Sequence, residues 1–335
     1  MTAPPVGAAP RVVALGGGHG LSATLQALRR VTPHVTAVVT VADDGGSSGR
    51  LREELGVLPP GDLRMALAAL AGDDDWGRTW SALLQHRFAG DGPLAGHAVG
   101  NLLLAGLTSS TGDAVQALDH TARLVGAVGR VLPMSCTPLE IVADVEGSAE
   151  QVRGQVAVAT TPARVTAVHL RPSDPQACAE SLQAVLDADW VVLGPGSWFT
   201  SVLPHLLVPG LRDALVRTRA RRLVCLNLAA QDGETSGFTP EAHLEALHSH
   251  CPDLRLDVVL ADRHATGDPR GLMLAAAAAG AELRLADVAR DDGTPRHDPE
   301  RLAQVYAQVF DGTTTTGNST TGYSTTGNST TGTEQ

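Results

Sequence analysis

The chain has 335 residues, of which 43% are apolar but only 3% aromatic, so aliphatic side chains and alanine must fill its core. Its formal net charge of −11 argues against a nucleic-acid-binding surface, where a basic stripe is expected. All 25 basic residues are arginine, and without lysine the chain can build neither a Walker-A loop nor a Schiff base.

The cysteines and the N-terminus indicate where in the cell the protein is expected. Cys136, Cys178, Cys225 and Cys251 form no C-x-x-C motif, so neither a disulfide scaffold nor a zinc ribbon is predicted. Residues 1–10 lack the charged and apolar regions of a signal peptide, and no apolar run approaches the ~20 residues of a membrane span. We therefore expect a cytoplasmic protein with no membrane insertion and no nucleic-acid partner.

Strand and helix patterns alternate along the first part of the chain. A strand over residues 11–15, a helix over 21–30 and a strand over 35–41 come first. The helical patterns that follow lie at 62–71, 76–88, 96–107 and 113–128. Residues 131–170 then show strand patterns without intervening helices, at 139–145, 152–159 and 165–170. We interpret them as a small β-rich insertion.

The alternation returns after the insertion. Helices are predicted at 176–186, 197–207, 240–250, 271–279 and 299–310, and strands at 190–193, 223–228, 256–261 and 282–285. Strands separated by helices predict an α/β protein with a Rossmann-like, doubly wound, mostly parallel sheet. We expect one domain over 11–310, a disordered N-terminus over 1–10, and a disordered low-complexity tail over 311–335.

The first candidate ligand loop joins the first strand to the first helix. Gly17, Gly18 and Gly20 let the backbone approach a ligand closely, and the start of the helix directs free N–H groups at an anion. His19 would cap the helix or contact the ligand. The alternative is a tight turn that binds nothing.

A second polar loop follows the second strand. Asp43 and Asp44 are candidates for binding ribose or sugar hydroxyls or Mg²⁺. Ser47 and Ser48 are candidate donors to phosphate, and Arg50 is a candidate to neutralise it. The alternative is an Asp- and Ser-rich turn that caps a helix beginning near residue 51.

Two further segments hold secondary candidates. Asp62 follows Pro-Pro-Gly and is predicted to be the N-cap of a helix, with Arg64 beside it. His97 and Asn101 are the polar side chains at the start of an otherwise apolar helix.

A second strand–turn–helix unit contains Gly194, Gly196 and Ser197, with Thr200 and Ser201 one turn further on. The start of its helix is predicted to be a second anion site. In a doubly wound sheet this turn and the first glycine turn lie at the same edge. One diphosphate between them, flanked by a nucleoside and a sugar, is therefore the ligand that the loops favour.

The segments GGGHGLS, VTVADDGGSSGRLREELGVLPPGD, GHAVGNLLLAGL and VVLGPGSWFTSVLPHLLVPG closely resemble the gluconeogenesis-factor (YvcK-like) family, related in fold to 2-phospho-L-lactate transferase. The resemblance covers about 11–310. It implies a Rossmann-like cytoplasmic protein tied to carbon metabolism, cell shape and peptidoglycan synthesis, which binds a UDP-sugar, notably UDP-N-acetylglucosamine. The phosphate-binding positions that it implies are Gly17, Gly18, Gly20, Ser47, Ser48, Gly194, Gly196 and Ser197. The chain departs at His19, where the family often has threonine.

Three functions remain open. The first is a non-catalytic nucleotide-sugar-binding regulator, a homo-oligomer with unidentified protein partners in cell-wall synthesis. The second is a transferase that acts on a nucleoside-diphosphate-linked donor, with Asp43 or Asp44 holding Mg²⁺. The third is an NAD(P)-dependent oxidoreductase, which the G-x-G-x-x-A pattern at 18–23 supports. No motif places a general acid, so no catalytic residue is predicted.

Overall fold

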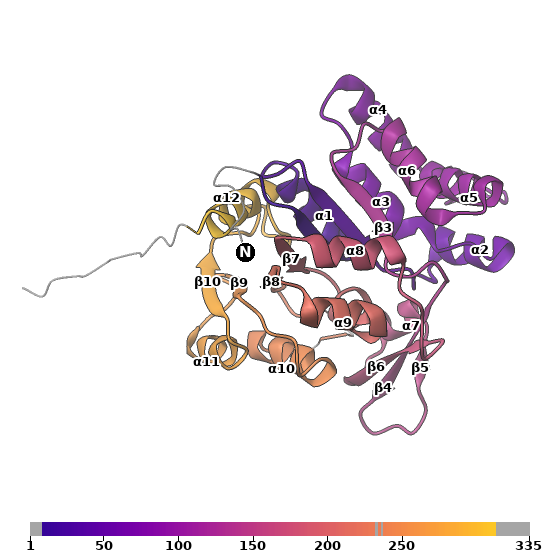
Figure 1. The fold of residues 1–335 in the computed structure, drawn as a ribbon. Helices are drawn as coiled ribbons and strands as arrows, with labels where there is room; N and C mark the ends of the chain where they lie inside the picture. The colour runs from indigo at the N-terminus through magenta and orange to yellow at the C-terminus, as the bar shows by residue number, and fades with distance from the viewer. Residues whose placement is uncertain (1–8, 232–233, 236, 313–335) are drawn as a thin grey trace, which may run out of the picture.

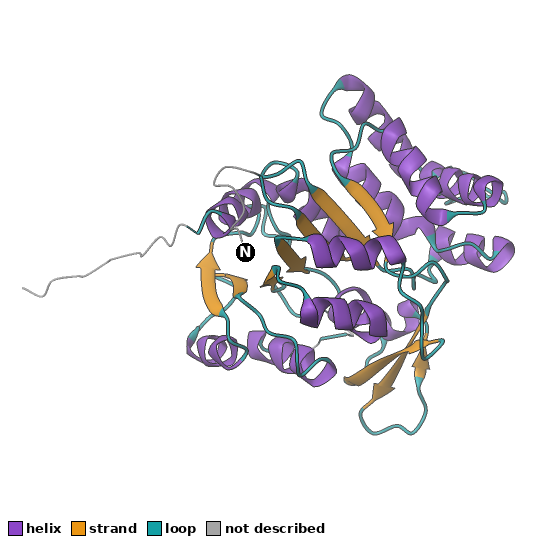
Figure 2. Ribbon diagram, in the orientation of Figure 1, coloured by secondary structure: helices purple, strands orange, loops and turns teal. Residues whose placement is uncertain are grey.

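Seven parallel strands form the central sheet (Figures 1 and 2). The computed structural model describes residues 9–231, 234–235 and 237–312. The strands are β1 (Val12–Gly16), β2 (Val35–Val39), β3 (Arg130–Pro133), β7 (Trp190–Leu193), β8 (Arg221–Cys225), β9 (Val258–Asp262) and β10 (Glu282–Ala286). They lie in the order β10-β9-β8-β7-β1-β2-β3, and each neighbouring pair is parallel. The predicted α/β fold is confirmed.

The strand order determines where a ligand can lie. The chain runs from β1 outward to β2 and β3 on one side and later returns to β7, which pairs with the other side of β1. β1 and β7 therefore flank the topological switch point, where the loops that follow the two strands diverge and leave a crevice. Every residue of both strands is buried, which is why both appear as unbroken aliphatic runs in the sequence.

Helices cover both faces of the sheet (Figure 1). Their bounds are α1 (Gly18–Leu28), α2 (Gly46–Leu55), α3 (Pro60–Leu70), α4 (Asp75–Gln85), α5 (Val99–Thr111), α6 (Ala114–Leu124), α8 (Ala179–Asp187), η1 (Trp198–Val202), η2 (Leu203–Leu207), α9 (Pro209–Arg217), α10 (Pro240–His250), α11 (Arg270–Ala278) and α12 (Pro299–Phe310). α1 packs against α3 and α12, whereas α8 packs against α9, and α10 against η2 and α11. α2, α4, α5 and α6 extend beyond β3.

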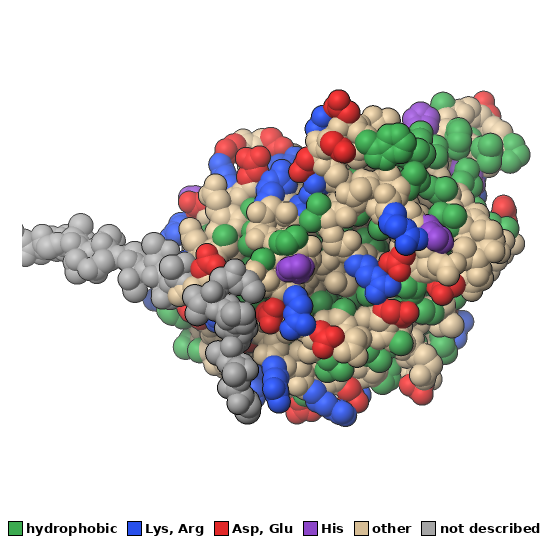
Figure 3. Space-filling view, turned by 45° about the horizontal axis from the view of Figure 1, so that its top comes forward, with side chains coloured by type: hydrophobic (Ala, Val, Ile, Leu, Met, Phe, Trp, Pro, Cys, Tyr) green, Lys and Arg blue, Asp and Glu red, His purple; other side chains and the backbone are tan. Residues whose placement is uncertain are grey.

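Apolar side chains gather on the outer surface of this helical extension (Figure 3). Trp76 is 57% exposed and Leu83 is 39% exposed, and the ring of Trp76 lies 5.6 Å from that of Trp80. Charged side chains of both signs intermingle over the rest of the face shown in Figure 3. Across the described ranges, no helix combines the length and the apolar character that a membrane span requires.

The predicted β-rich insertion is smaller than expected and contains a helix. β4 (Glu140–Val145), β5 (Val152–Arg153) and β6 (Val165–Arg171) form a separate antiparallel sheet, whereas β3 belongs to the central sheet. The strand predicted at 152–159 is confirmed only at its start, in β5, and is wrong beyond it, because the chain then forms α7 (Gln155–Thr160). Gly154 has a φ of +92°, which ends the strand, and the first turn of α7 donates to a carboxylate from outside the insertion.

Two predicted helix starts are corrected. α2 begins at Gly46 and not near residue 51, so Ser47 and Ser48 lie in its first turn. α3 begins at Pro60 with Pro59 as N-cap residue, so Asp62 is a residue of the first turn and not the cap. Proline suits the first position of a helix because its missing N–H would have no partner there.

The helix predicted at 197–207 is also corrected. It is a π-helical turn, η1, followed by the 3₁₀-helix η2. Pro204 lacks the N–H that an α-helical ladder would need at that position. Residues 1–8 and 313–335 of the predicted disordered ends lie outside the described residues, and the division into domains stays a prediction.

Candidate functional site

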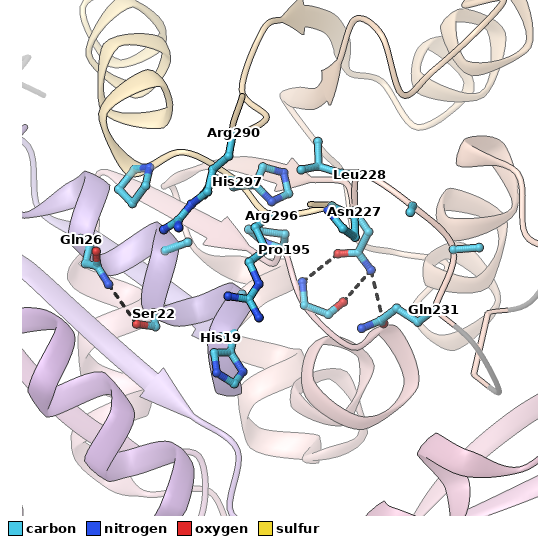
Figure 4. A pocket seen from close by; sticks show the side chains of 17 residues that line it. His19, Ser22, Gln26, Pro195, Asn227, Leu228, Gln231, Arg290, Arg296 and His297 are labelled. Carbon is cyan, nitrogen blue, oxygen red and sulfur yellow. Dashed lines mark hydrogen bonds between the residues drawn. The ribbon is translucent and has the colours of Figure 1, made fainter. Parts of the chain in front are cut away.

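A cavity of about 370 Å³ opens at the carboxyl edge of the sheet, beside the switch point (Figure 4). Four segments far apart in the sequence line it: the start of α1, the turn after β7, the residues after β8, and the residues before α12. Among the described residues that line it there is no aspartate or glutamate, although the chain carries a net charge of −11.

The glycine turn after β1 delivers the start of α1 to this cavity. Gly18 has a φ of +57°, a conformation that glycine adopts without strain, and α1 has no side-chain N-cap. His19 and Gly20 line the cavity, so the positive end of the helix dipole faces it. A Cβ on Gly20 would lie 2.2 Å from the carbonyl oxygen of Pro195, so the first turn of α1 touches the turn after β7 directly.

Two arginines enter the cavity from a hairpin between β10 and α12. The N–H of Arg290 donates to the carbonyl of Arg296 at 2.9 Å, and Gly293 turns the chain with a φ of +74°. Figure 4 shows both guanidinium groups directed into the cavity, that of Arg296 toward His19. Two cations on facing positions repel each other, so this arrangement favours an anion between them.

The acids of this hairpin point elsewhere. Asp291 pairs with Arg301 on α12, and Asp292 accepts a hydrogen bond from the hydroxyl of Thr294. Asp287, at the hairpin's base, lies 3.4 Å from Arg263. Hydrogen bonds from Thr294 lower the pKa of Asp292, and the charges of Arg290 and Arg296 help to lower it, so this carboxylate offsets part of the positive charge. Within residues 287–298, all of which the structure describes, no carboxylate forms an ion pair with either guanidinium group.

Hydrogen-bonding groups of the turn after β7 already have partners within the protein. The N–H of Gly196 donates to Oδ1 of Asn227 at 2.9 Å, and Nδ2 of Asn227 donates back to the carbonyl of Gly196 at 2.8 Å. Ser197 donates to the buried carboxyl of Glu234 and lies against the hydroxyl of Thr200. Burial raises the pKa of Glu234, and hydrogen bonds from Ser197 oppose that shift. Of the predicted second anion loop, only Gly196 and its neighbour Pro195 line the cavity.

A second polar cluster lies beneath the glycine turn. Oγ1 of Thr40 donates to Oδ2 of Asp62 at 3.0 Å, and a Cβ on Gly17 would lie 2.4 Å from that oxygen and 3.2 Å from Oγ of Ser201. Burial raises the pKa of Asp62 to about 6, and the nearby charge of Asp43 adds to the shift. Asp62 therefore supports the turn from below and does not line the cavity.

We predict that Asp62→Asn stabilises the protein at neutral pH. The folded-state pKa of about 6 lies above the usual 3.8, so neutral Asp62 contributes stability below pH ~4 that is lost as the pH rises through 6. About two pKa units correspond to ~3 kcal/mol at pH 7. Urea unfolding should be measured from pH 4 to pH 8. The free energy of unfolding of the variant should exceed that of wild type at pH 7 and equal it near pH 4.

Asp43→Asn is the matched control for that prediction. It removes the neighbouring charge but leaves the Asp62 carboxyl in place, so it should give a smaller gain of the same sign. Equal stability of wild type and Asp62→Asn at pH 7 would show that the buried carboxyl carries no such cost.

The two predicted loop acids differ in role. Oδ1 of Asp44 accepts the N–H of Val156 at 3.0 Å and so caps α7 of the insertion. Oδ1 of Asp43 accepts the N–H of Gly45 at 2.9 Å, whereas a Cβ on Gly61 would meet its other oxygen at 2.7 Å. Neither carboxylate lines the cavity, and their predicted roles in binding ribose or Mg²⁺ stay predictions.

The serines of α2 are also outside the cavity. Oγ of Ser47 lies 2.9 Å from Nδ1 of His97 and accepts a hydrogen bond from Nδ2 of Asn101 at 3.0 Å, and all three side chains are buried. Burial lowers the pKa of His97, and Nδ1 of its uncharged ring can accept a hydrogen bond from the hydroxyl of Ser47. This cluster ties α2 to α5. Ser48 is buried beside it against Gly61.

The two predicted arginines have partners within the protein. Nη2 of Arg50 donates to the carbonyl of Ala95 at 2.7 Å, and Nη1 donates to Pro93 at 3.3 Å. Arg64 donates to Gln85, and burial lowers its pKa to about 10. Both guanidinium groups stabilise the helical extension and lie away from the cavity.

The structure thus brings His19, Gly20 and Gly196 of the predicted residues to the cavity. It adds polar residues that the sequence reasoning missed, which are Gln26, Asn227, Gln231, Arg290, Arg296 and His297. One signal was available: Asp-Gly at 292–293 is a hairpin turn dipeptide, and it stands between two arginines in a chain without lysine.

The described side chains form no metal-binding cluster. Across residues 9–231, 234–235 and 237–312, no three His, Cys, Asp or Glu side chains are grouped so as to hold a metal ion. Mg²⁺ is usually held by one or two carboxylates together with substrate phosphates, and the predicted role of Asp43 or Asp44 in holding it stays a prediction.

The fold and the cavity define a Rossmann-like α/β protein with a crevice at its switch point, which two arginines and, among the described residues, no acid line. Residues 12–293 match the family described as 2-phospho-L-lactate transferase CofD. A Mycobacterium tuberculosis (strain H37Rv) protein whose name contains the words gluconeogenesis factor is 56% identical over 303 residues, 88% of each chain. The gluconeogenesis factor of Listeria monocytogenes is 34% identical, over 91% of this chain and 97% of its own.

A crystal structure of a relative has the same fold. A Bacillus halodurans protein described as a member of the UPF0052 family has a TM-score of 0.80 and 36% identity, over 88% of this chain and 97% of its own. The chain belongs to the gluconeogenesis-factor family, which is related to the CofD transferases.

Proposed function

We propose that this chain is a regulatory protein that binds a nucleotide sugar, UDP-N-acetylglucosamine in the first instance, with the diphosphate held in the cavity at the switch point. One observation carries the proposal: although the chain is strongly acidic, the described residues that line the cavity include no carboxylate and gather Arg290, Arg296 and the positive end of α1. A diphosphate carries the charge that such a lining requires, and planar guanidinium groups suit phosphate oxygens.

The rest of the lining suits what flanks a diphosphate. On one side of the arginines, Leu228, Ala229 and Ala230 offer an apolar surface beside the amide of Gln231. On the other side, Ser22 and Gln26 of α1 offer polar groups. A nucleoside on the apolar side and a sugar on the polar side would use both. The UDP moiety and the links to cell shape and peptidoglycan synthesis come from the family resemblance.

The alternative is a transferase that acts on a nucleoside-diphosphate-linked donor, which the CofD match supports. Proton transfer at this cavity would fall to His19 or His297, because no carboxylate is among the described residues that line it. Burial lowers the pKa of His297 to about 4, so at neutral pH its ring is uncharged and no imidazolium is present to act as a general acid. This counts against acid catalysis by His297 and so favours a regulator. An oxidoreductase is disfavoured because the acid after β2 that would bind the cofactor's ribose does not line the cavity.

We further propose that the protein works in the cytoplasm as a homo-oligomer with protein partners of cell-wall synthesis. Its central claim is tested by thermal shift. UDP-N-acetylglucosamine at ~100 times its dissociation constant should stabilise the fold by about 2.7 kcal/mol and be recovered unchanged by chromatography. A shift with NAD(P) alone, or steady release of UDP or UMP, would contradict the regulator.

A further inference from the structure

The hairpin that carries Arg290 and Arg296 depends on anchors outside itself. The N–H of Asp298 donates to the carbonyl of Val288 at 2.8 Å and closes the hairpin, and Ala289 and His297 form an antiparallel β-bridge. A single two-stranded hairpin is at best marginally stable in water. Within the hairpin, Nε of Arg290 donates to the carbonyl of His297 at 3.4 Å, so its guanidinium group moves with the hairpin. The position of the hairpin is in turn set by whatever holds its base.

Asp262, the last residue of β9, provides that anchor. Its side chain is 3% exposed and accepts four backbone hydrogen bonds. Oδ1 accepts the N–H groups of His264 and Ala265 in its own loop, at 2.9 and 3.0 Å. Oδ2 accepts those of Val288 and Ala289, at 2.9 and 3.1 Å. These last two residues follow β10 and open the hairpin.

The carboxylate form suits this position. Burial raises the pKa of Asp262, but the hydrogen bonds from Val288, Ala265, His264 and Ala289 outweigh burial and hold the pKa below its usual value. An ionised carboxylate offers four acceptor sites, and here all four are filled by N–H groups. The same base is held from its other side, because Nη1 of Arg301 donates to the carbonyl of Ala289 at 2.8 Å.

We propose that Asp262 is a positioning residue that aims Arg290 and Arg296 at the anionic part of the ligand. Arg290 directly follows Ala289, whose N–H and carbonyl are both held, and its own N–H meets Arg296 across the hairpin. Loosening the bonds from Asp262 to the hairpin removes one of the two anchors of Ala289, and both guanidinium groups then shift together although Arg301 still holds the Ala289 carbonyl. The inference rests on the proposed function, because it assigns Asp262 a role in that same site.

A double-mutant cycle tests it, with UDP-N-acetylglucosamine as the probe. Asp262→Asn replaces one acceptor oxygen with an NH₂ donor and should weaken binding roughly tenfold. In the Arg290→Ala, Arg296→Ala background the same substitution should change affinity less than about twofold, because no guanidinium remains to be aimed. Calorimetry, with ligand-observed NMR for the weak variants, gives all four dissociation constants.

Asp268→Asn is the matched control. Asp268 lies on the same connection between β9 and α11 but pairs with the exposed Arg270, so its substitution should leave affinity unchanged. If Asp262→Asn does not fold, Ala289→Pro replaces it in the cycle. That variant removes an N–H that Asp262 accepts and leaves the loop of His264 and Ala265 intact.

The outcomes separate the two claims. Equal losses in both backgrounds, or an Asp262 or Ala289 variant with wild-type affinity, would overturn the positioning role and leave the proposed function standing. A loss in the Asp268 control would overturn it too, since the effect would not be specific to the hairpin. Wild-type protein that binds neither UDP-N-acetylglucosamine nor inorganic pyrophosphate would overturn the proposed function and this inference with it.

Discussion

Replacing both Arg290 and Arg296 by alanine is expected to weaken binding of UDP-N-acetylglucosamine at least 100-fold. Each guanidinium lines the cavity from the same hairpin, and no lysine exists elsewhere in the chain to take over. A hydrogen bond to a charged group contributes about 1.5–3 kcal/mol, so two of them amount to about 3–6 kcal/mol. Each single variant should bind UDP-N-acetylglucosamine roughly tenfold more weakly than wild type. Calorimetry at two salt concentrations should show that the affinity of each single variant depends less on salt than that of wild type.

Arg50→Ala is the matched control for this loss. This substitution also removes an arginine side chain. The guanidinium group of Arg50, however, donates to the carbonyls of Pro93 and Ala95 and does not line the cavity. Its affinity should equal that of wild type, while its stability falls by about 1 kcal/mol. Near-wild-type affinity of the double variant would place the ligand elsewhere, whereas a loss in Arg50→Ala would return a direct role to that arginine.

Local sequence patterns predicted the parts of the fold that local physics controls. β1 and β7 are buried on both faces, so each is a continuous aliphatic run that can be read directly. α12 begins at Pro299 after the N-cap Asp298 and ends at Phe310, as its sequence predicts. The glycine turn was found because glycines between a strand and a helix serve backbone approach to a ligand.

Elements that depend on distant partners were misjudged. Residues 155–160 are rich in β-branched residues and alanine, and the first turn of their helix donates to Asp44, more than 100 residues away. The donors at Gly196 and Ser197 looked free in the sequence, but Asn227 and Glu234 occupy them. The residues at 290 and 296 belong to no motif, and only the sheet topology brings them to the start of α1.

Gly20→Ala is expected to damage both stability and ligand binding. The new Cβ would lie 2.2 Å from the carbonyl oxygen of Pro195 and 2.7 Å from Cα of Gly196, closer than any real contact. Both obstacles are backbone atoms, so the first turn of α1 or the turn after β7 must move. Such overpacking costs about 3 kcal/mol, more than the ~1 kcal/mol that alanine gains by restricting the unfolded chain. Because both segments line the cavity, the same movement disturbs the ligand.

Gly106→Ala separates this clash from the general effect of replacing glycine. Gly106 is an exposed residue inside α5, and a Cβ there would meet nothing within 4 Å. That variant should gain about 0.5–1 kcal/mol, because alanine is the better helix former. Denaturant unfolding should therefore move the two midpoints in opposite directions, and UDP-N-acetylglucosamine should protect Gly106→Ala as it protects wild type but Gly20→Ala far less. Equal stability of the two variants would mean that α1 and the turn after β7 do not touch as the cavity requires.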